Sequence, residues 1–377
     1  MSPLSRRMTR LPSLYASLSK VKLSALVVAT TVAGFQLSPG SLQLPLLAWT
    51  ATGVALSSFS ANTLNQWFES PFDAQMGRTR GRPLPTQRLS ASHAFSYAIV
   101  AGLCGVGLLA VKAGWLAAVL SGTNIALYAA LYTPLKRSSV ANTWVGAVVG
   151  AIPPMIGYVA GGGGFDLGCL VLGATLYCWQ FPHFNALSWN LRADYSRAGY
   201  CMASVLNPKL TVDSALRHSL ALLPLSALVV YSGICDSWWF IVHATPLHLG
   251  MVYLAYQFRQ NPSRPTARRL FFIDNPINKR LTNQCAGPRG PTDYHGGCPG
   301  YHMLAGQGPT VTLCMERLEE ILRNTELNTA APTRPVEIPR KRRNAIDTMQ
   351  PFAFPLVVPK PSSSIPETLY QRGTARL

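Results

Sequence analysis

Carboxylate and amide side chains recur at four-residue intervals in one polar stretch of the sequence. Asn65, Glu69 and Asp73 are each four residues apart, so a helix would place all three on one face. Pro71 lies among them and predicts a kink or a helix end near Ser70. Oxygen ligands of this kind suit Mg²⁺, which commonly binds one or two carboxylates together with substrate phosphates.

Arginines follow these acids directly, at Arg78, Arg80 and Arg82. Guanidinium groups pair with phosphate oxygens through two parallel hydrogen bonds. The stretch therefore predicts a site for Mg²⁺ and a diphosphate. The alternative is a loop at a membrane surface whose acids only neutralise its own arginines.

A second polar stretch repeats this chemistry. Asn190 and Asp194 are again four residues apart, Arg192 lies between them, and Tyr195 follows. If the two stretches face one another, each could hold one Mg²⁺ on a shared diphosphate. The helices between them would then offer an apolar slot for a long hydrocarbon chain.

Long apolar runs flank both stretches and must position them. The 377 residues are 48% hydrophobic and only 13% charged, whereas soluble domains carry about 25% charged residues. Only six carboxylates precede Phe258. The sequence predicts an all-α, polytopic membrane protein with about eight transmembrane helices. The expected spans are Leu23–Leu37, Leu42–Leu64, His93–Val111, Ala113–Tyr132, Val140–Ala160, Phe165–Leu187, Ala215–Ile234 and Trp238–Phe258.

Basic residues predict how these spans are oriented. With eight spans, 19 Lys and Arg residues up to Arg269 fall on the side of the N-terminus, and only Lys112 falls on the other side. Positively charged loops stay in the cytoplasm, or in the matrix of a mitochondrion, so both polar stretches are expected to face that compartment. This topology explains the basic residues between the spans, and no nucleic-acid partner is expected.

The two polar stretches also resemble a known family. NQWFESPFDAQMGRTRGRPL and WQFPHFNALSWNLRADYSRAGYCM are similar to the signature loops of the protohaem IX farnesyltransferases, or haem O synthases, and LSKVKLSALVVATTVAGF is similar to their first span. These enzymes belong to the intramembrane aromatic prenyltransferase (UbiA) superfamily, and the loop sequences resemble those of its mitochondrial members. The resemblance implies transfer of the farnesyl group of farnesyl diphosphate to a vinyl group of haem B. The product, haem O, leads to haem A for cytochrome c oxidase assembly.

The resemblance further implies roles for single residues. Four would be catalytic and would bind the Mg²⁺ that bridges to the diphosphate: Asn65, Glu69, Asp73 and Asp194. Three would bind diphosphate: Arg78, Arg82 and Arg192. Three would line the haem or substrate pocket: His183, Asn190 and Tyr195. Haem B is expected as a substrate and not as a cofactor.

The sequence and its family resemblance also predict the domain organisation and the location of the chain. Residues 1–22 are expected to be a basic, presequence-like or membrane-surface segment, residues 23–258 the transmembrane prenyltransferase domain, and residues 259–377 a polar, Pro- and Arg-rich tail that is disordered and unrelated to the family. The resemblance implies the mitochondrial inner membrane, with the motif loops facing the matrix. The expected partners are farnesyl diphosphate, haem B, the lipid bilayer, and the next enzyme of haem A synthesis or a second copy of the chain.

Three alternatives remain open. The family is expected to have nine spans, and the ninth is missing after Phe271, so the chain could be a truncated, inactive isoform. Another intramembrane prenyltransferase would use a quinone precursor such as 4-hydroxybenzoate as its acceptor. A transporter or channel would place its charged residues in mid-span, whereas here the acids cluster at span ends.

Overall fold

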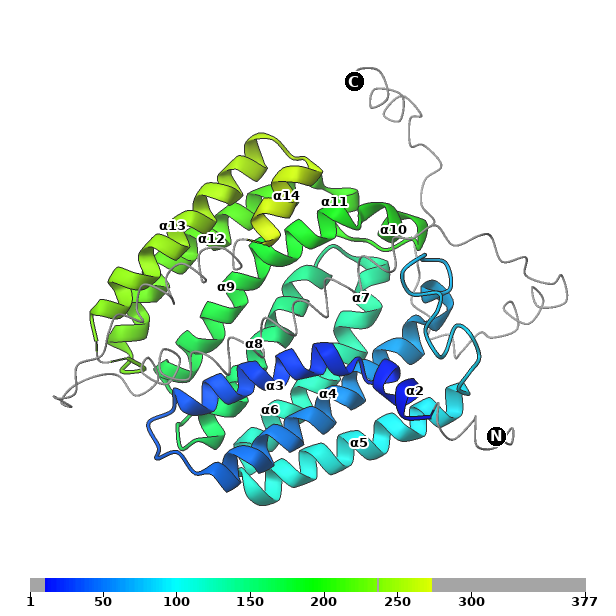
Figure 1. The fold of residues 1–377 in the computed structure, drawn as a ribbon, viewed down its shortest axis with the longest axis horizontal. Helices are drawn as coiled ribbons and strands as arrows, with labels where there is room; N and C mark the ends of the chain where they lie inside the picture. Colours follow the sequence, from blue (N-terminus) through cyan, green and yellow to red (C-terminus); the bar gives the residue numbers. More distant parts are fainter. Residues whose placement is uncertain (1–10, 236, 273–377) are drawn as a thin grey trace, which may run out of the picture. The chain divides into compact units, whose positions relative to one another are not determined.

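The computed structural model describes residues 11–235 and 237–272, and this part of the chain is helical, with no strand (Figure 1). The all-α prediction is therefore confirmed. Asp236, residues 1–10 of the expected presequence-like segment and residues 273–377 of the expected tail lie outside the described residues.

Each apolar run predicted as a span coincides with a helix. The long helices are α3 (Val21–Gln36), α4 (Leu44–Asp73), α5 (Ala91–Lys112), α6 (Trp115–Ala126), α8 (Asn142–Ala160), α9 (Leu167–Asn190), α12 (Pro208–Tyr231) and α13 (Trp239–Gln260). Shorter elements join them: α2 (Leu11–Leu18), the π-helical turn η1 (Leu127–Tyr132), α7 (Thr133–Ser138), α10 (Arg192–Arg197), α11 (Ala203–Leu206) and α14 (Arg264–Phe271).

Five helices in the described part are long and apolar enough to cross a membrane: α4, α5, the continuous run from α6 to α7, α8 and α12. The count becomes six if α2 and α3, which meet at an angle of 56°, form one bent span. Helices α9 and α13 have spanning length, but they carry more polar and aromatic side chains. The described residues thus contain five or six clearly apolar spans, where the sequence predicts about eight.

Close backbone contact between α3 and α8 fixes the place of α3 in the bundle. A Cβ atom at Gly157 would lie 1.9 Å from the carbonyl oxygen of Thr31, and one at Gly34 would lie 2.0 Å from that of Pro154. Small residues allow such close packing between membrane helices.

A buried polar cluster sets the register of α3 against α4. Asn62 Nδ2 donates to Ser24 Oγ at 3.0 Å, and Ser58 Oγ donates to the same atom at 2.9 Å. The Tyr128 hydroxyl of η1 reaches Asn62 Oδ1 at 3.4 Å. In an apolar bundle each of these groups needs a polar partner, so the three elements fit together in few other registers.

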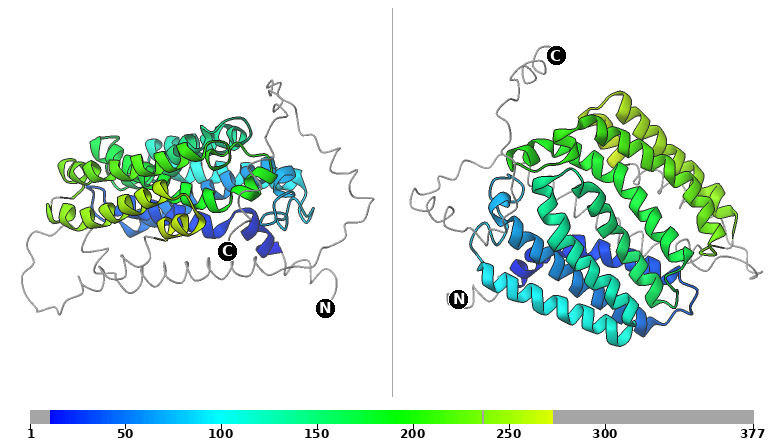
Figure 2. Two further views of the ribbon diagram at one scale, coloured as in Figure 1. Left: turned by 90° about the horizontal axis from the view of Figure 1, so that it is seen from above. Right: turned by 180° about the vertical axis from the view of Figure 1, so that it is seen from behind.

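The polar loops gather at one end of the helices. Figures 1 and 2 show α7, α10, α11 and the loop after α4 together at this end. Ring packing of Phe72 on Tyr200, with centroids 6.0 Å apart, joins the last turn of α4 to the loop after α10. The expectation that both polar stretches emerge at the same end is therefore met within the structure.

Two details differ from the sequence-based expectations. Helix α4 continues through Pro71 to Asp73 without ending near Ser70. Proline removes one N–H donor and crowds the preceding turn, but here it lies in the last turn, where the helix is about to end. The helical region also continues beyond Phe258, because α13 ends at Gln260 and α14 buries Ala267 and Leu270 against α9 and α13.

Candidate functional site

The last turns of α4 carry the three oxygen ligands expected for Mg²⁺. Asn65 and Asp73 are fully buried, and Glu69 is 5% exposed. They lie on one face because α4 is continuous through Asp73 and they are spaced by four residues. Burial of two carboxylates on one face requires compensating positive charge.

Three cations from three different segments compensate these groups. Lys20 Nζ donates to Asn65 Oδ1 at 2.6 Å, Lys136 Nζ lies 2.8 Å from Glu69 Oε1, and Arg82 lies 2.6 Å from Asp73 Oδ2. Three basic side chains thus face two carboxylates and one amide, and this favours a strongly anionic ligand.

Lys20 reaches the site because the chain bends sharply between α2 and α3. Its backbone has φ 46° and ψ 53°, which is the left-handed region that a lysine rarely adopts. Gln66 Nε2 holds the end of α2 by donating to the carbonyl oxygens of Ser17 at 2.9 Å and Leu18 at 2.6 Å. These bonds stabilise the strained bend and keep the ammonium group beside Asn65.

Lys136 is placed by the π-helical turn between α6 and α7. Its Nζ lies 4.3 Å from the centroid of the Tyr132 ring, a cation–π distance. Thr133 Oγ1 accepts a 3.1 Å hydrogen bond from Asn65 Nδ2. Wide turns inside α-helices are frequent at functional sites because they shift side chains out of the regular spacing; here the shift brings Thr133 and Lys136 against α4.

The second polar stretch covers the site with aromatic side chains. Tyr195 and Tyr200 pack with ring centroids 6.1 Å apart, and Tyr200 clusters with Met76 and Met202. Burial raises the pKa of both tyrosines, and the nearby Glu69 carboxylate raises each further, so both remain neutral phenols. The amide N–H of Cys201 donates to the carbonyl oxygen of Lys136 at 2.6 Å, which ties this stretch to α7.

Two buried oxygen atoms at the site lack a hydrogen-bond partner among the described residues: Asp73 Oδ1 and Tyr200 Oη. A buried oxygen without a partner costs free energy, about 1–3 kcal/mol for a neutral group. Such an arrangement is typical of positions that a ligand completes. Asp73 offers an acceptor suited to a metal ion, and Tyr200 offers a donor suited to an oxyanion.

Other predicted site residues lie further from this constellation. Asp194 pairs with Arg197 at 3.4 Å, within its own helix. Arg192 lies over the Trp189 ring at 4.6 Å, and Asn190 Nδ2 donates to the carbonyl of Ala186 at 3.1 Å. Within the described ranges, no three His, Cys, Asp or Glu side chains converge on one point. The second stretch contacts the first through Ala198, Tyr200 and Met202, which cluster with Met76.

The ring of His183 lies in the contact between α9 and α14. It stacks on Trp179, with centroids 4.9 Å apart, and on Phe271, with centroids 4.4 Å apart. Arg78 is exposed in the loop after α4, and its charge acts on Tyr195. The structure therefore brings together Asn65, Glu69, Asp73 and Arg82, with Tyr195 and Arg78 near them, and leaves His183 at a helix contact.

Sequence reasoning missed four groups at the site: Lys20, Thr133, Lys136 and Tyr200. In the sequence, Lys20 and Lys136 indicate only how the membrane spans are oriented. A usable signal was present, because both lie at the ends of apolar runs on the same side as the carboxylates. Thr133 and Tyr200 offered no such signal, since a hydroxyl in a membrane helix or loop is common.

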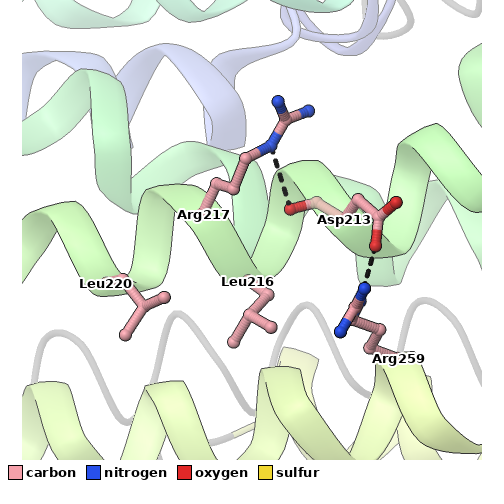
Figure 3. Close-up of a pocket in the computed structure, with 5 residues that line it drawn as sticks. All are labelled: Asp213, Leu216, Arg217, Leu220 and Arg259. Carbon is pink, nitrogen blue, oxygen red and sulfur yellow. Dashed lines mark hydrogen bonds and ion pairs between the residues drawn. The ribbon is translucent and has the colours of Figure 1, made fainter.

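A separate hollow lies on α12 and α13 (Figure 3). It is lined by Asp213, Leu216, Arg217, Leu220 and Arg259. It shares no residue with the carboxylate site.

Residues 27–275 match the model of the UbiA prenyltransferase family. The chain belongs to this family. The matched region includes every predicted site residue and α14, and it extends beyond the expected boundary at residue 258.

Curated family members are similar over most of this region. The mitochondrial protoheme IX farnesyltransferase of Homo sapiens is 49% identical over 286 residues, which cover 75% of this chain and 64% of that protein. The Arabidopsis thaliana protein of the same name is 43% identical over 261 residues, covering 68% of this chain and 60% of that protein. The chain thus spans less than two thirds of the length of these relatives.

Solved structures of family members share the fold. A digeranylgeranylglyceryl phosphate synthase superposes with a TM-score of 0.61 at 14% identity, covering 71% of this chain and 94% of that chain. A UbiA homologue from Archaeoglobus fulgidus, bound to GPP and Mg²⁺, superposes with a TM-score of 0.54 at 15% identity, covering 70% of this chain and 96% of that chain.

Proposed function

We propose that this chain transfers the farnesyl group of farnesyl diphosphate to a vinyl group of haem B, giving haem O. Its membership of the UbiA family supports prenyl transfer, and the names of the similar mitochondrial proteins support the farnesyl donor and the haem acceptor. One structural observation carries the proposal. The three buried oxygen ligands of α4 each contact a cation from a different segment, so the site is built for a metal–diphosphate ligand.

Mg²⁺ fits the residues present. Asn65, Glu69 and Asp73 offer hard oxygen donors, and Asp73 Oδ1 has no partner in the described part of the chain. The Archaeoglobus homologue, whose structure holds GPP and Mg²⁺, supports this assignment. When bound, the ion would neutralise negative charge that develops on the departing diphosphate. We further propose that Asp194 of α10 supports a second ion.

The cations of the site would bind the diphosphate. Lys20, Lys136 and Arg82 already lie beside the carboxylate face, and each can turn from its present partner toward phosphate oxygens. Arg78 and Arg192 lie in the two loops and would add charge from the exposed side. Tyr200 would donate its unpartnered hydroxyl to a phosphate oxygen.

These groups favour departure of the diphosphate, which is the difficult step. The bond between C1 and oxygen breaks, diphosphate keeps the electron pair, and the allylic cation is stabilised by delocalisation. The terminal vinyl carbon of haem B then bonds to C1. Water adds to the cation left on the neighbouring carbon and releases one proton, giving the hydroxyethylfarnesyl group. No protein nucleophile is required, and the apolar helices would keep other water out until capture.

The haem would bind beside the second stretch. His183, Asn190 and Tyr195 are the proposed lining residues, and the rings of Trp179 and Phe271 stack on His183. The proposed location is the mitochondrial inner membrane, with the carboxylate site on the matrix side. The names of the relatives support the organelle, and the basic residues at this end support the orientation.

One assay tests substrate and competence together. The purified chain in detergent is incubated with farnesyl diphosphate, Mg²⁺ and an equimolar mixture of haem B and 4-hydroxybenzoate, and the products are identified by mass. We expect haem O and no prenylated benzoate. Prenylation of 4-hydroxybenzoate without haem O would contradict the proposal and favour the quinone-precursor alternative.

A further inference from the structure

The hollow on α12 and α13 has a charged end and an apolar wall (Figure 3). Its lining combines Asp213, Arg217 and Arg259 with Leu216 and Leu220. A second hollow adjoins it and shares Asp213 and Arg259. The second hollow adds Lys209, Val212 and Gln260 to the lining. Together they form one groove, which we call the α12–α13 groove.

The charges in this groove are not balanced. Arg259 Nε lies 2.6 Å from Asp213 Oδ1, so the single carboxylate is engaged by this arginine. Arg217 Nε donates only to the backbone carbonyl of Asp213, at 3.4 Å. Among the described residues, neither Arg217 nor Lys209 has a carboxylate partner. Three cations against one anion leave an excess of two positive charges.

Arg217 lies near the polar end of α12. It is nine residues after Pro208, the first residue of α12, which corresponds to about 13 Å along the helix axis. Helix α12 is one of the apolar spans, and the side chain of Arg217 is exposed on it. Its Nε bonds one turn back, toward the polar end of α12, as a snorkelling arginine does. An anion at the membrane surface would complete this site.

The apolar wall continues from the charged end along the span. Leu216 and Leu220 are four residues apart on α12, and Leu220 is 45% exposed. An acyl chain lying along these side chains would keep its phosphate beside Arg217 and Arg259. A free phosphate ion would use only the charged end.

We propose that the α12–α13 groove binds an anionic phospholipid, with the headgroup phosphate between Arg217, Arg259 and Lys209 and an acyl chain against Leu216 and Leu220. Guanidinium groups pair with phosphate oxygens. Basic pockets between membrane helices on the cytoplasmic or matrix side bind anionic headgroups. The site is distinct from the carboxylate site and does not rest on the proposed catalytic activity.

Native mass spectrometry of the purified chain tests the proposal. Dioleoyl phosphatidylglycerol and dioleoyl phosphatidylcholine are added to the protein in detergent, and the occupancy of each bound lipid is measured over a concentration series. We expect tighter binding of phosphatidylglycerol. Arg217→Gln should weaken it about tenfold, because it removes a charge-assisted contact. Arg217→Lys should weaken it less, because it keeps the charge but loses the planar fork.

Arg268→Gln is the matched control, since this exposed arginine of α14 does not line the groove. Its lipid binding should equal that of the unmodified chain. Equal binding of the two lipids, or undiminished phosphatidylglycerol binding by folded Arg217→Gln, would overturn the proposal. Displacement of the lipid by an equal concentration of inorganic phosphate would also overturn it, because the site would then take the free ion.

Discussion

The ammonium group of Lys20 lies 2.6 Å from Asn65 Oδ1, and this contact joins the bend between α2 and α3 to the carboxylate face of α4. Lys20 belongs to the segment that the sequence presents as presequence-like. In the structure this segment also contributes to the site, because Gln66 binds the end of α2 and Lys20 then lies beside Asn65. Of the basic residues in segment 1–22, Arg6, Arg7 and Arg10 lie outside the described residues, Lys22 is exposed on α3, and Lys20 contacts a proposed metal ligand.

Replacing Lys20 by methionine tests its proposed contact with diphosphate. The change removes the charge and keeps the length of the side chain, so we expect the KM for farnesyl diphosphate to rise about tenfold, the loss of one charge-assisted hydrogen bond. Steady-state kinetics with haem B held constant measure the effect. Lys112→Met is the control, because Lys112 lies over Trp49 at the other end of its span. An unchanged KM in Lys20→Met would exclude Lys20 from the diphosphate site.

Asp73→Asn tests the proposed metal site at its unpartnered oxygen. The amide keeps the size of the side chain but loses the negative charge, so we expect turnover to fall about 100-fold or more, as when a group that stabilises developing charge is removed. Asp166→Asn serves as the control, because Asp166 caps α9 through a 2.9 Å bond to the Cys169 amide and asparagine also caps helices. Full turnover in folded Asp73→Asn would remove Asp73 from the catalytic groups.

The ion pair of Lys136 and Glu69 is buried, and its partners should depend on one another. Lys136→Met alone leaves a buried carboxylate without its cation, which costs about 3–5 kcal/mol. Thermal unfolding in detergent should therefore shift to a lower temperature. The double variant Lys136→Met, Glu69→Gln should recover much of this loss, because both charges are gone. Equal destabilisation in the single and double variants would show that the pair is not coupled.

Tyr200→Phe separates the hydroxyl of Tyr200 from its ring. The ring packing on Phe72 is kept, so the thermal stability should stay the same or rise slightly, since an unpartnered buried hydroxyl is removed. The KM for farnesyl diphosphate should rise about fivefold if this hydroxyl donates to a phosphate oxygen. Tyr158→Phe is the control, because the hydroxyl of Tyr158 contacts Asp166 and no residue of the site. If Tyr200→Phe and Tyr158→Phe give the same kinetics, the proposed donor is wrong.

The sequence by itself determined the fold class, the segments that become helices, and the α4 part of the site. Apolar runs of spanning length and a scarcity of acids left few alternatives to a helical membrane protein. The four-residue spacing placed Asn65, Glu69 and Asp73 on one face, and the structure keeps them there because α4 continues through Pro71 to Asp73. The two signature loops predicted the UbiA family, and the match of residues 27–275 to the model of that family confirms this prediction.

Only the tertiary structure decided which cations serve which oxygens. In the sequence, Arg82 lies 62 residues after Lys20, and Lys136 lies 54 residues after Arg82. The three side chains meet because of the α2–α3 bend, the π-helical turn and the loop after α4. None of these features follows from periodicity, because each is a departure from regular helix geometry. The fold also decided that Tyr195 and Tyr200, more than Asp194, lie against the first stretch. Local spacing predicts which residues share a face, but packing between distant segments determines what that face contacts.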